Sequence, residues 1–483
     1  MTNYEPVIGV EVHVELNTQT KIFCPCPVTF LAEQNTATCP ICLGLPGVLP
    51  VLNESVVESA LSTALALNCS IHQDQIFERK NYYYPDLPKA YQITQRQLPI
   101  GHDGSIEFTV NDKVKRVGIT DVHMEEDTGK SVHGDEAGYD YSLINYNRSG
   151  VPLIEIISEP HINSIEEVEA YMITLRQMLD YLGVSDCRME LGQMRFEASV
   201  SLRPMGDTVL GTRVEIKNLN SFRAVTGALR AEIERQRLLL RGKEPVRQAT
   251  VLWNEARGIT EIMRLKETAD DYRYFPEPDL VPVSINEAWI EKCSQSMPEM
   301  PGVRCARFIE VLGLCTHVAA LLTTVKDCAD YFEDCLVVHN NCKIVSNWMT
   351  SDLQGLLNEA GKPWGECPVT PHHLGGLLDL LADGTISGRI AKQVLPEMFA
   401  TGKDSESVVE EKGLIQVTDE GAFRKIIEAL AAANPKSVED YKSGNQKIVG
   451  FFVGQVMRET EGKANPQLVN SLVRDVLKQY GSE

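Results

Sequence analysis

The stretch VIGVEVHVEL, residues 7–16, alternates apolar residues with small or polar ones, which predicts a β-strand. One face of this strand carries the apolar side chains of Ile8, Val10, Val12 and Val14. The other face carries Gly9, Glu11, His13 and Glu15. A solvent-exposed outer face is the usual explanation for polar residues that alternate along a half-buried strand. Two carboxylates and an imidazole on one face also suit a cation site, so both interpretations stay open at this point.

Two further stretches place acidic residues in similar settings. TDVHMEEDTGKS, residues 120–131, is rich in acids, and VPLIEIISEP, residues 151–160, sets Glu155 alone between two isoleucines. A carboxylate inside an apolar run is costly to bury without a cationic partner. The candidate ligands for a hard divalent cation such as Mg²⁺ are Glu11, His13, Glu155 and either Glu125 or Glu126. Spacing alone does not show that they converge, and a set of unrelated surface acids is the alternative.

Four cysteines lie close together in FCPCPVTFLAEQNTATCPICLG, residues 23–44. Cys24 and Cys26 form a C-x-C pair, and Cys39 and Cys42 form a C-x-x-C pair. Two tight pairs of soft ligands favour a closed tetrahedral Zn²⁺ site over two pairs of buried thiols. Because cysteine fills all four positions, we expect the zinc to be structural.

Aromatic residues are interleaved with cations in RKNYYYPDLPKAYQITQRQ, residues 79–97. Such a pattern can stack unpaired bases and neutralise phosphates at a single-stranded RNA end. The residues predicted to hold that end are Tyr82, Tyr84, Lys89 and Tyr91. Tyrosines that belong to the core or its rim are the alternative.

A β-hairpin is predicted from MRFEASVSL, residues 194–202, and TRVEIKNLNSF, residues 212–222. Alternation places Arg195 and Glu197 on one face of the first strand, and Arg213, Glu215 and Lys217 on one face of the second. These charged faces can form ordinary cross-strand ion pairs, or a floor on which cations meet phosphates.

Size and charge set limits on the kind of protein. The chain has 483 residues, of which 43% are hydrophobic, so we expect two or three domains. Its 46 basic and 67 acidic residues give a formal net charge of −21, which repels nucleic-acid backbones at long range. Any RNA site must therefore be a local patch of cations.

The start of the chain, MTNYEPVIG, has neither the basic nor the apolar region of a secretion signal. The 13 cysteines are an odd number and are mostly scattered, which is typical of reduced thiols rather than of a disulfide framework. We therefore expect a soluble, cytoplasmic protein with no membrane segment.

The order of the predicted elements indicates an α+β protein. Short strands predominate up to about residue 285, with a helix after the capping box of Ser164 and Glu167 and another over roughly residues 223–240. Helical patterns take over after FPEPDLVPV, residues 275–283, and a weaker break lies at ATGKDSES, residues 400–407. We expect a β-rich domain over residues 1–290, an all-α domain over 291–403 and an all-α tail domain over 404–483.

Taken together, these stretches resemble the B subunit of glutamyl/aspartyl-tRNA amidotransferases. The resemblance covers the whole chain. It rests on IGVEVHVEL, CPICLGLPGVLPVLN, FERKNYYYPDLPKAYQIT, HMEEDTGKS, NYNRSGVPLIEIISEP, VEIKNLNSFR, DDYRYFPEPDL, ISGRIAKQV and GKANPQLVN.

The resemblance implies a cradle-shaped N-terminal domain that uses ATP and Mg²⁺ to activate a side-chain carboxylate of a misacylated tRNA. The positions that match the family's metal ligands are Glu11, His13, Glu125 and Glu155, with Glu126 as the alternative to Glu125. Beyond the motif match, we take Arg148, Arg195 and Lys217 as cations that face the phosphates. Glu126 and Glu197 are further positions expected at the cofactor. Glu197 departs from the family pattern, which more often has Asp at this position.

The resemblance also implies partners. The chain shows no glutaminase motif, so ammonia is expected from an A subunit of the serine-amidase type, held with a small C subunit in a heterotrimer. The substrates implied are Glu-tRNA(Gln), Asp-tRNA(Asn) or both, and the tail domain is implied to grip the tRNA. The rival hypotheses are a non-catalytic, zinc-stabilised scaffold that docks tRNA, and a metal-dependent hydrolase that works without ATP.

Overall fold

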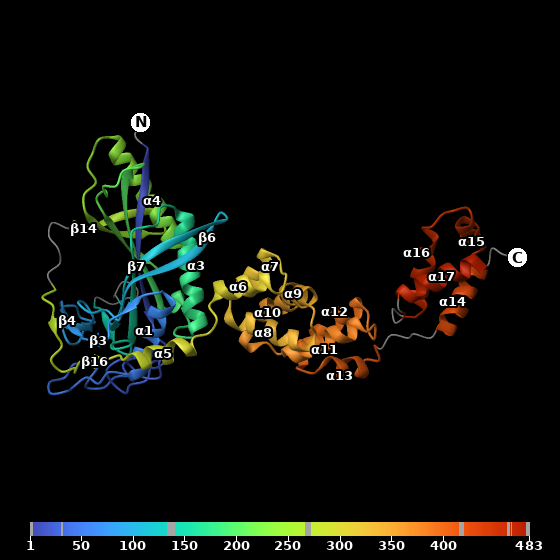
Figure 1. Cartoon of the computed structure of the whole chain (residues 1–483), viewed down its shortest axis with the longest axis horizontal. Helices are drawn as coiled ribbons and strands as arrows, with labels where there is room; N and C mark the ends of the chain where they lie inside the picture. Colours follow the sequence, from blue (N-terminus) through green and yellow to red (C-terminus); the bar gives the residue numbers. More distant parts are fainter. Residues whose placement is uncertain are drawn as a thin grey trace. The chain divides into compact units, whose positions relative to one another are not determined.

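The computed structural model describes residues 3–29, 32–132, 141–265, 272–414, 420–460, 464 and 466–479. It divides into two compact units, Met1–Gly302 and Val303–Glu483, which are shown in Figure 1. In the described part of the chain, every strand lies between residues 4 and 284, and helices alone follow from residue 287 to 479. The α+β prediction is therefore confirmed, while the boundaries of the three predicted domains stay predictions.

One large sheet dominates the first unit. Its main path runs in the order β14-β13-β12-β11-β1-β10-β7-β5-β4-β15. The strands on this path are β1 (Tyr4–Glu15), β4 (Glu78–Asn81), β5 (Tyr91–Thr94), β7 (Lys113–Glu126), β10 (Pro152–Ser158), β11 (Met194–Pro204), β12 (Val214–Leu219), β13 (Ala249–Asn254), β14 (Ile259–Leu265) and β15 (Phe275–Pro276). Beside this path, β6 (Gly101–Val110) pairs with β7 and with β2 (Ser70–Ile71). Two small sheets join β3 (Asp74–Gln75) to β16 (Val283–Ser284), and β8 (Lys130–Val132) to β9 (Leu143–Asn145).

The predicted hairpin is present, because β11 pairs antiparallel with β12. The opening strand β1 lies between β11 and β10 in the middle of the sheet. Its four alternating apolar side chains, from Ile8 to Val14, are at most 1% exposed.

Helices cover the apolar face of this sheet. They are α1 (Glu54–Ala66), α3 (Ile165–Leu182) and α4 (Phe222–Arg241), whose buried side chains share one core with those of β1. The helix predicted from the capping box is α3, where the Ser164 side chain accepts from the Glu167 amide and the Glu167 carboxylate accepts from the Asn163 amide. A short 3-10 turn, η1 (Met189–Leu191), precedes β11, and α5 (Glu287–Ser296) follows the last strand.

The helical remainder has two separate hydrophobic cores. The first is built by α6 (Pro301–Glu310), α7 (Thr316–Leu322), α8 (Lys326–Val338), α9 (Cys342–Trp348), the π-helical turn η2 (Met349–Leu353), α10 (Gln354–Ala360), η3 (Trp364–Glu366), α11 (Pro371–Ala382), α12 (Gly388–Thr401) and α13 (Ser405–Glu411). The second is built by α14 (Glu420–Ala433), α15 (Pro435–Lys442), α16 (Ile448–Glu459) and α17 (Pro466–Gln479). None of the helices in the described ranges has the length and apolarity needed to cross a membrane.

Candidate active site

Four neighbouring strands present polar side chains on the sheet face opposite the helices. The pairing register puts His13 of β1 opposite Glu155 of β10 on one side and opposite Arg195 of β11 on the other. Glu155 is in turn opposite His123 of β7, and Glu11 is opposite Glu197. Since partners in register share a face, the apolar alternation that buries one side of β1 also gathers these charged side chains on the other.

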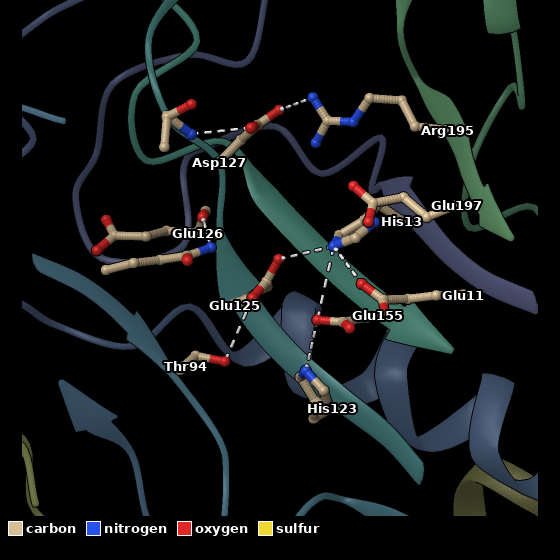
Figure 2. A network of polar contacts seen from close by, with 12 residues as sticks. Glu11, His13, Thr94, His123, Glu125, Glu126, Asp127, Glu155, Arg195 and Glu197 are labelled. Atoms are coloured by element: carbon tan, nitrogen blue, oxygen red, sulfur yellow. Dashed lines mark hydrogen bonds and ion pairs between the residues drawn. The ribbon is translucent and has the colours of Figure 1, made fainter. Parts of the chain in front are cut away.

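The gathered side chains converge on one imidazole. The Nε2 atom of His13 lies 3.7 Å from Glu11 Oε1, 3.5 Å from Glu125 Oε1 and 3.6 Å from Glu155 Oε2. Figure 2 shows the three carboxylates pointing toward this nitrogen from three strands. His123 Nε2 lies 2.8 Å from Glu155 Oε2 and extends the group. We call these five residues the acid cluster; the four predicted metal ligands all belong to it.

The two adjacent acids of β7 point to opposite faces of the sheet. Glu125 lies in the acid cluster and accepts a hydrogen bond from Thr94 Oγ1 at 3.3 Å. Glu126 instead accepts from the Lys89 ammonium and, at 2.8 Å, from the backbone amide of Ile93. Of the two candidates that the sequence left open, Glu125 is therefore the one that faces His13.

Burial and mutual contacts shift the pKa values of the residues in the acid cluster. Burial, followed by the neighbouring Glu155 carboxylate, raises the pKa of Glu11 to about 8. Burial opposes the charged form of His13, but Glu155, Glu125 and Glu11 outweigh it and raise the pKa of His13 to about 9. Burial also opposes ionisation of Glu155, yet His123 and His13 hold its pKa well below its usual range. Protons on Glu11 and His13 therefore reduce the repulsion among these carboxylates, and a divalent ion bound by the same groups would displace those protons.

Cations flank the acid cluster. Asp127 Oδ2 lies 3.1 Å from Arg195 Nη1 and 3.2 Å from Arg148 Nε, so one buried carboxylate holds both guanidinium groups. Lys217 Nζ lies 2.7 Å from Glu197 and 3.6 Å from Glu215. The three predicted phosphate-facing cations therefore lie beside the cluster, each held by carboxylates.

Two hollows open on this face and meet at Glu197. One, of about 350 Å³, is lined by His13, Glu125, Arg195, Lys80 and Tyr82 among others. The other, of about 270 Å³, is lined by Gly9, Glu11, Ser199, Arg213 and Glu215 among others. The acid cluster thus borders two adjoining hollows, and the larger one is of the size that holds a small ligand.

The predicted RNA-end residues do not form one group. Tyr82 lines the hollow that contains His13. Lys89 and Tyr91 line a different hollow, beside Cys42 and Glu126. Tyr84 is 59% exposed and lines neither of these two hollows. Their role at an RNA end stays a prediction.

His123, Lys80 and Asp127 are among the residues of this face that had no individual role assigned. His123 lies in the acid-rich stretch at residues 120–131, and its alternation with Glu125 along one strand face was the signal that could have singled it out. Lys80 borders the same hollow; burial opposes its charge, but Glu125 and Glu155 raise its pKa above the usual lysine value. The role of Asp127 as the anchor for two arginines depends on contacts from separate segments, which no local pattern reveals.

The four predicted zinc ligands also come together. Sulfur atoms of Cys24, Cys26, Cys39 and Cys42 all lie within 4.8 Å of one another, which fits a metal cluster and is compatible with structural zinc. The Cys24 thiol, the Cys39 backbone amide and Lys21 lower the pKa of Cys42 to about 5, against the effect of burial. A low thiol pKa favours the thiolate form that binds metal, whereas burial and the neighbouring Cys39 and Cys42 thiols raise the pKa of Cys26 to about 11.

This cysteine segment is joined to the loop that carries Arg148. The hydrogen bonds that link the two include Asn35 N to Asn145 Oδ1 at 3.3 Å, Tyr146 N to Asn35 Oδ1 at 2.7 Å, Ala37 N to Asn147 Oδ1 at 2.9 Å, and Ser149 Oγ to the Cys42 carbonyl at 3.2 Å. The cysteine segment therefore holds in place the loop that carries Arg148.

Comparison with known proteins agrees with this geometry. The GatB/GatE catalytic domain family matches residues 6–291, the part that contains the acid cluster and the four cysteines. The chain belongs to the B-subunit family of aspartyl/glutamyl-tRNA amidotransferases. A second match, to the GatB domain family, covers residues 330–477 of the helical part.

Full-length relatives give the same family. The chain is 53% identical to the aspartyl/glutamyl-tRNA(Asn/Gln) amidotransferase B subunit of Moorella thermoacetica, over 98% of this chain and 100% of that protein. It is 52% identical to the corresponding protein of Carboxydothermus hydrogenoformans, over 99% of each chain. The corresponding protein of Geobacter sulfurreducens is 51% identical, over 99% of this chain and 100% of that protein. The resemblance inferred from the sequence motifs is confirmed.

Proposed function

We propose that this component of a tRNA-dependent amidotransferase carries the ATP-dependent activating site. The substrate is the side-chain carboxylate of glutamate or aspartate on a misacylated tRNA, and the product is the corresponding amide. The observation that supports this most strongly is the acid cluster, which lies between two hollows and next to three cations.

The residues present fit a divalent cation. Ligand atoms of Glu11, His13 and Glu155 lie within 4.8 Å of one another, and so do those of His123, Glu125 and Glu155. Oxygen-rich sets of this kind suit a hard ion, and the unfavourable repulsion among the carboxylates favours binding it. Mg²⁺ held there would offset negative charge on the triphosphate.

The chain's own cations have a separate task. Arg195 lines the hollow beside His13, and Asp127 connects it to Arg148, which lines a neighbouring hollow together with Arg195. In this proposal Arg195 donates to phosphate oxygens beside His13, and Arg148 adds positive charge from the neighbouring hollow. Lys217, held by Glu197 at the junction of the hollows, adds a third charge. Because these groups are held in place before the reaction, little reorganisation is needed as charge develops.

The chemistry explains why ATP is required. A carboxylate resists attack by ammonia because its carbonyl carbon is electron-rich and oxide is a very poor leaving group. Transfer of the γ-phosphoryl group to the carboxylate gives an acyl phosphate and ADP. Ammonia then attacks the carbonyl carbon and loses a proton, and the C–O bond to phosphate breaks. The products are the amide and inorganic phosphate.

We propose two partner subunits, by analogy with what the family implies. An A subunit of the serine-amidase type would release ammonia from glutamine, and a small C subunit would hold the A and B subunits together. Glu-tRNA(Gln) and Asp-tRNA(Asn) remain alternative substrates in this proposal, and the described residues favour neither.

The test supplies ammonium chloride in place of glutamine to the purified complex, with ATP and each misacylated tRNA in turn. We expect phosphate release and amide formation that depend on both ATP and the matching tRNA. Amide formation without ATP would favour a metal-dependent hydrolase mechanism run in reverse. Binding of tRNA without phosphate release would reduce the chain to a docking scaffold.

A further inference from the structure

Lys21 lies at the base of the cysteine segment, and its side chain is completely buried. It is 0% exposed, which makes it one of the largest fully buried side chains among the described residues. Its Nζ atom lies 2.9 Å from the Ala37 carbonyl oxygen and 3.6 Å from Cys42 Sγ. In the described ranges of the chain, no carboxylate lies within ion-pair distance of this nitrogen.

A buried ammonium group needs a counter-ion. Moving such a charge out of water costs several kcal/mol even after the protein relaxes, and removing its partner leaves that cost without compensation. A single carbonyl dipole offsets only part of it. The remaining neighbour is the Cys42 sulfur, which also accepts a hydrogen bond from the Cys39 amide at 3.2 Å. Cys42 Sγ is therefore placed to become the negative partner of Lys21 when a metal ion holds it as a thiolate.

The cysteine cluster supplies more negative charge than one thiolate. Four thiolates around a divalent metal ion carry a net charge of −2, and in a buried site this excess is itself unfavourable. Cys24, Cys26 and Cys42 are buried, so water screens the excess poorly. The positive charge of Lys21 would thus offset the excess negative charge of the metal-loaded cluster, and the cluster would supply the negative partner that Lys21 lacks.

We propose that Lys21 is the internal counter-ion of the metal-loaded four-cysteine cluster, and that it slows metal release by its charge and by its N–H···S hydrogen bond to Cys42. This inference rests on the proposed zinc site, and it does not depend on ATP or tRNA. The rival explanation is that only the aliphatic stem of Lys21 matters, as packing against the loop at Gly150.

The test compares Lys21→Met, which keeps the stem and loses the charge, with Lys21→Arg, which keeps the charge. The matched control is Lys115→Met, because Lys115 forms a 2.9 Å ion pair with Glu167 away from the cysteines. The full chain is purified without chelators, its zinc content is measured, and the rate of zinc transfer to a coloured chelator is followed.

We expect Lys21→Met to release zinc about 10–100-fold faster than the wild type, the range typical for lost partners of metal ligands. Lys21→Arg should restore most of the retention, and Lys115→Met should match the wild type. Should Lys21→Met fail to fold, Lys21→Gln is measured in its place against the same criterion.

Zinc release from Lys21→Met at the wild-type rate would overturn the proposal in favour of packing alone. A wild-type chain that contains no zinc after this purification would overturn both this proposal and the zinc site. Neither result touches the proposed ATP-dependent reaction, whose assay is separate.

Discussion

His13 has three carboxylate oxygens 3.5–3.7 Å from its Nε2, longer than direct hydrogen bonds. The three carboxylates therefore lie close to one another, and none of them forms a short hydrogen bond with His13. Such an arrangement is favourable only if bound protons or a cation reduce the repulsion among the carboxylates. Beside them, Arg195 is held by Asp127 and not by the cluster itself. At the scale of single residues, the site therefore separates groups suited to hold a metal ion from groups suited to hold phosphate.

Replacing Arg195 with methionine tests this separation. Arg195→Met should lower kcat/KM for ATP-dependent amide formation by about 100-fold, as expected for loss of one fixed donor at a developing negative charge. Arg203→Met is the matched control, because Arg203 lies on the same strand, has a similar side-chain exposure of 25% against 32%, and pairs with Glu5 away from the hollows. Equal activity of the two variants would contradict the assigned role of Arg195.

Alternation and motif resemblance predicted much of this site, including Glu11, His13 and Glu155. They could not separate Glu125 from Glu126, because the choice depends on the register of β7 against β10. They also gave no individual role to Lys80. This residue is on β4, which lies several strands from β1 in the sheet, so only the folded shape of the sheet brings Lys80 to the site. Patterns along one strand show which face a residue takes, while pairing between strands decides what it meets.

At the scale of elements, the junction between residues 33–42 and 144–149 links the cysteine segment to the active site. Asn35 is central to it, because its amide oxygen accepts from Tyr146 N at 2.7 Å and its Nδ2 donates to the Ile144 carbonyl at 3.1 Å. Asn35 also has a φ of 60°, a left-handed conformation that asparagine and glycine tolerate.

Asn35→Gly removes both side-chain hydrogen bonds and leaves the backbone conformation acceptable. We expect faster amide hydrogen exchange in residues 144–149, by about 10-fold if the junction loses roughly 1.4 kcal/mol. Exchange in α3 should not change. Asn111→Gly, at a φ of 50° in the turn between β6 and β7, is the control. Unchanged exchange in the Asn35 variant would show that the segment does not support the Arg148 loop.

A second test at this scale concerns α6 and α8. The Arg304 side chain is 8% exposed and donates to Asp330 at 2.6 Å and to Glu333. Burial alone would raise the pKa of both acids. Hydrogen bonds from Lys326 and Arg304 nevertheless lower the pKa of Asp330. Hydrogen bonds from Arg307 and Arg304 likewise lower the pKa of Glu333. Acids with a depressed folded-state pKa stabilise the fold above their ordinary values of 3.8 and 4.5, and that stability is lost as the pH falls through the folded-state pKa.

Arg304→Met should therefore destabilise the helical unit at pH 7 by about 1–2 kcal/mol, since the partner carboxylates are partly exposed. The corresponding fall in melting temperature is about 2–8 °C and is measured by calorimetry on the full chain. The difference from wild type should shrink as the pH falls below 3.8. A difference that is the same at about pH 3 and about pH 7 would mean that lost packing, rather than charge, explains the effect.

At the scale of the whole molecule, the change from strands to helices was readable because the two parts have different periodicities. Strands with one buried face alternate every two residues, and the helical patterns after residue 285 repeat at about 3.6. The order of the strands was not readable. Neighbours such as β1 and β11 are nearly 200 residues apart in sequence, and β12 and β13 pair in parallel across the intervening α4. Long-range pairing of this kind depends on the packing of the whole core.

In the proposed site, side chains from three strands hold one divalent cation beside a bound triphosphate. The most direct test is electron paramagnetic resonance of Mn²⁺, a spectroscopic substitute for Mg²⁺, titrated into the full chain with and without a non-hydrolysable ATP analogue. We predict that the chain binds Mn²⁺ and that the analogue raises the affinity for Mn²⁺ by about 10-fold, equivalent to roughly 1.4 kcal/mol of coupling. The signal of bound Mn²⁺ should be lost in Glu155→Gln. Mn²⁺ binding that is indifferent to the analogue and unchanged in Glu155→Gln would contradict the account.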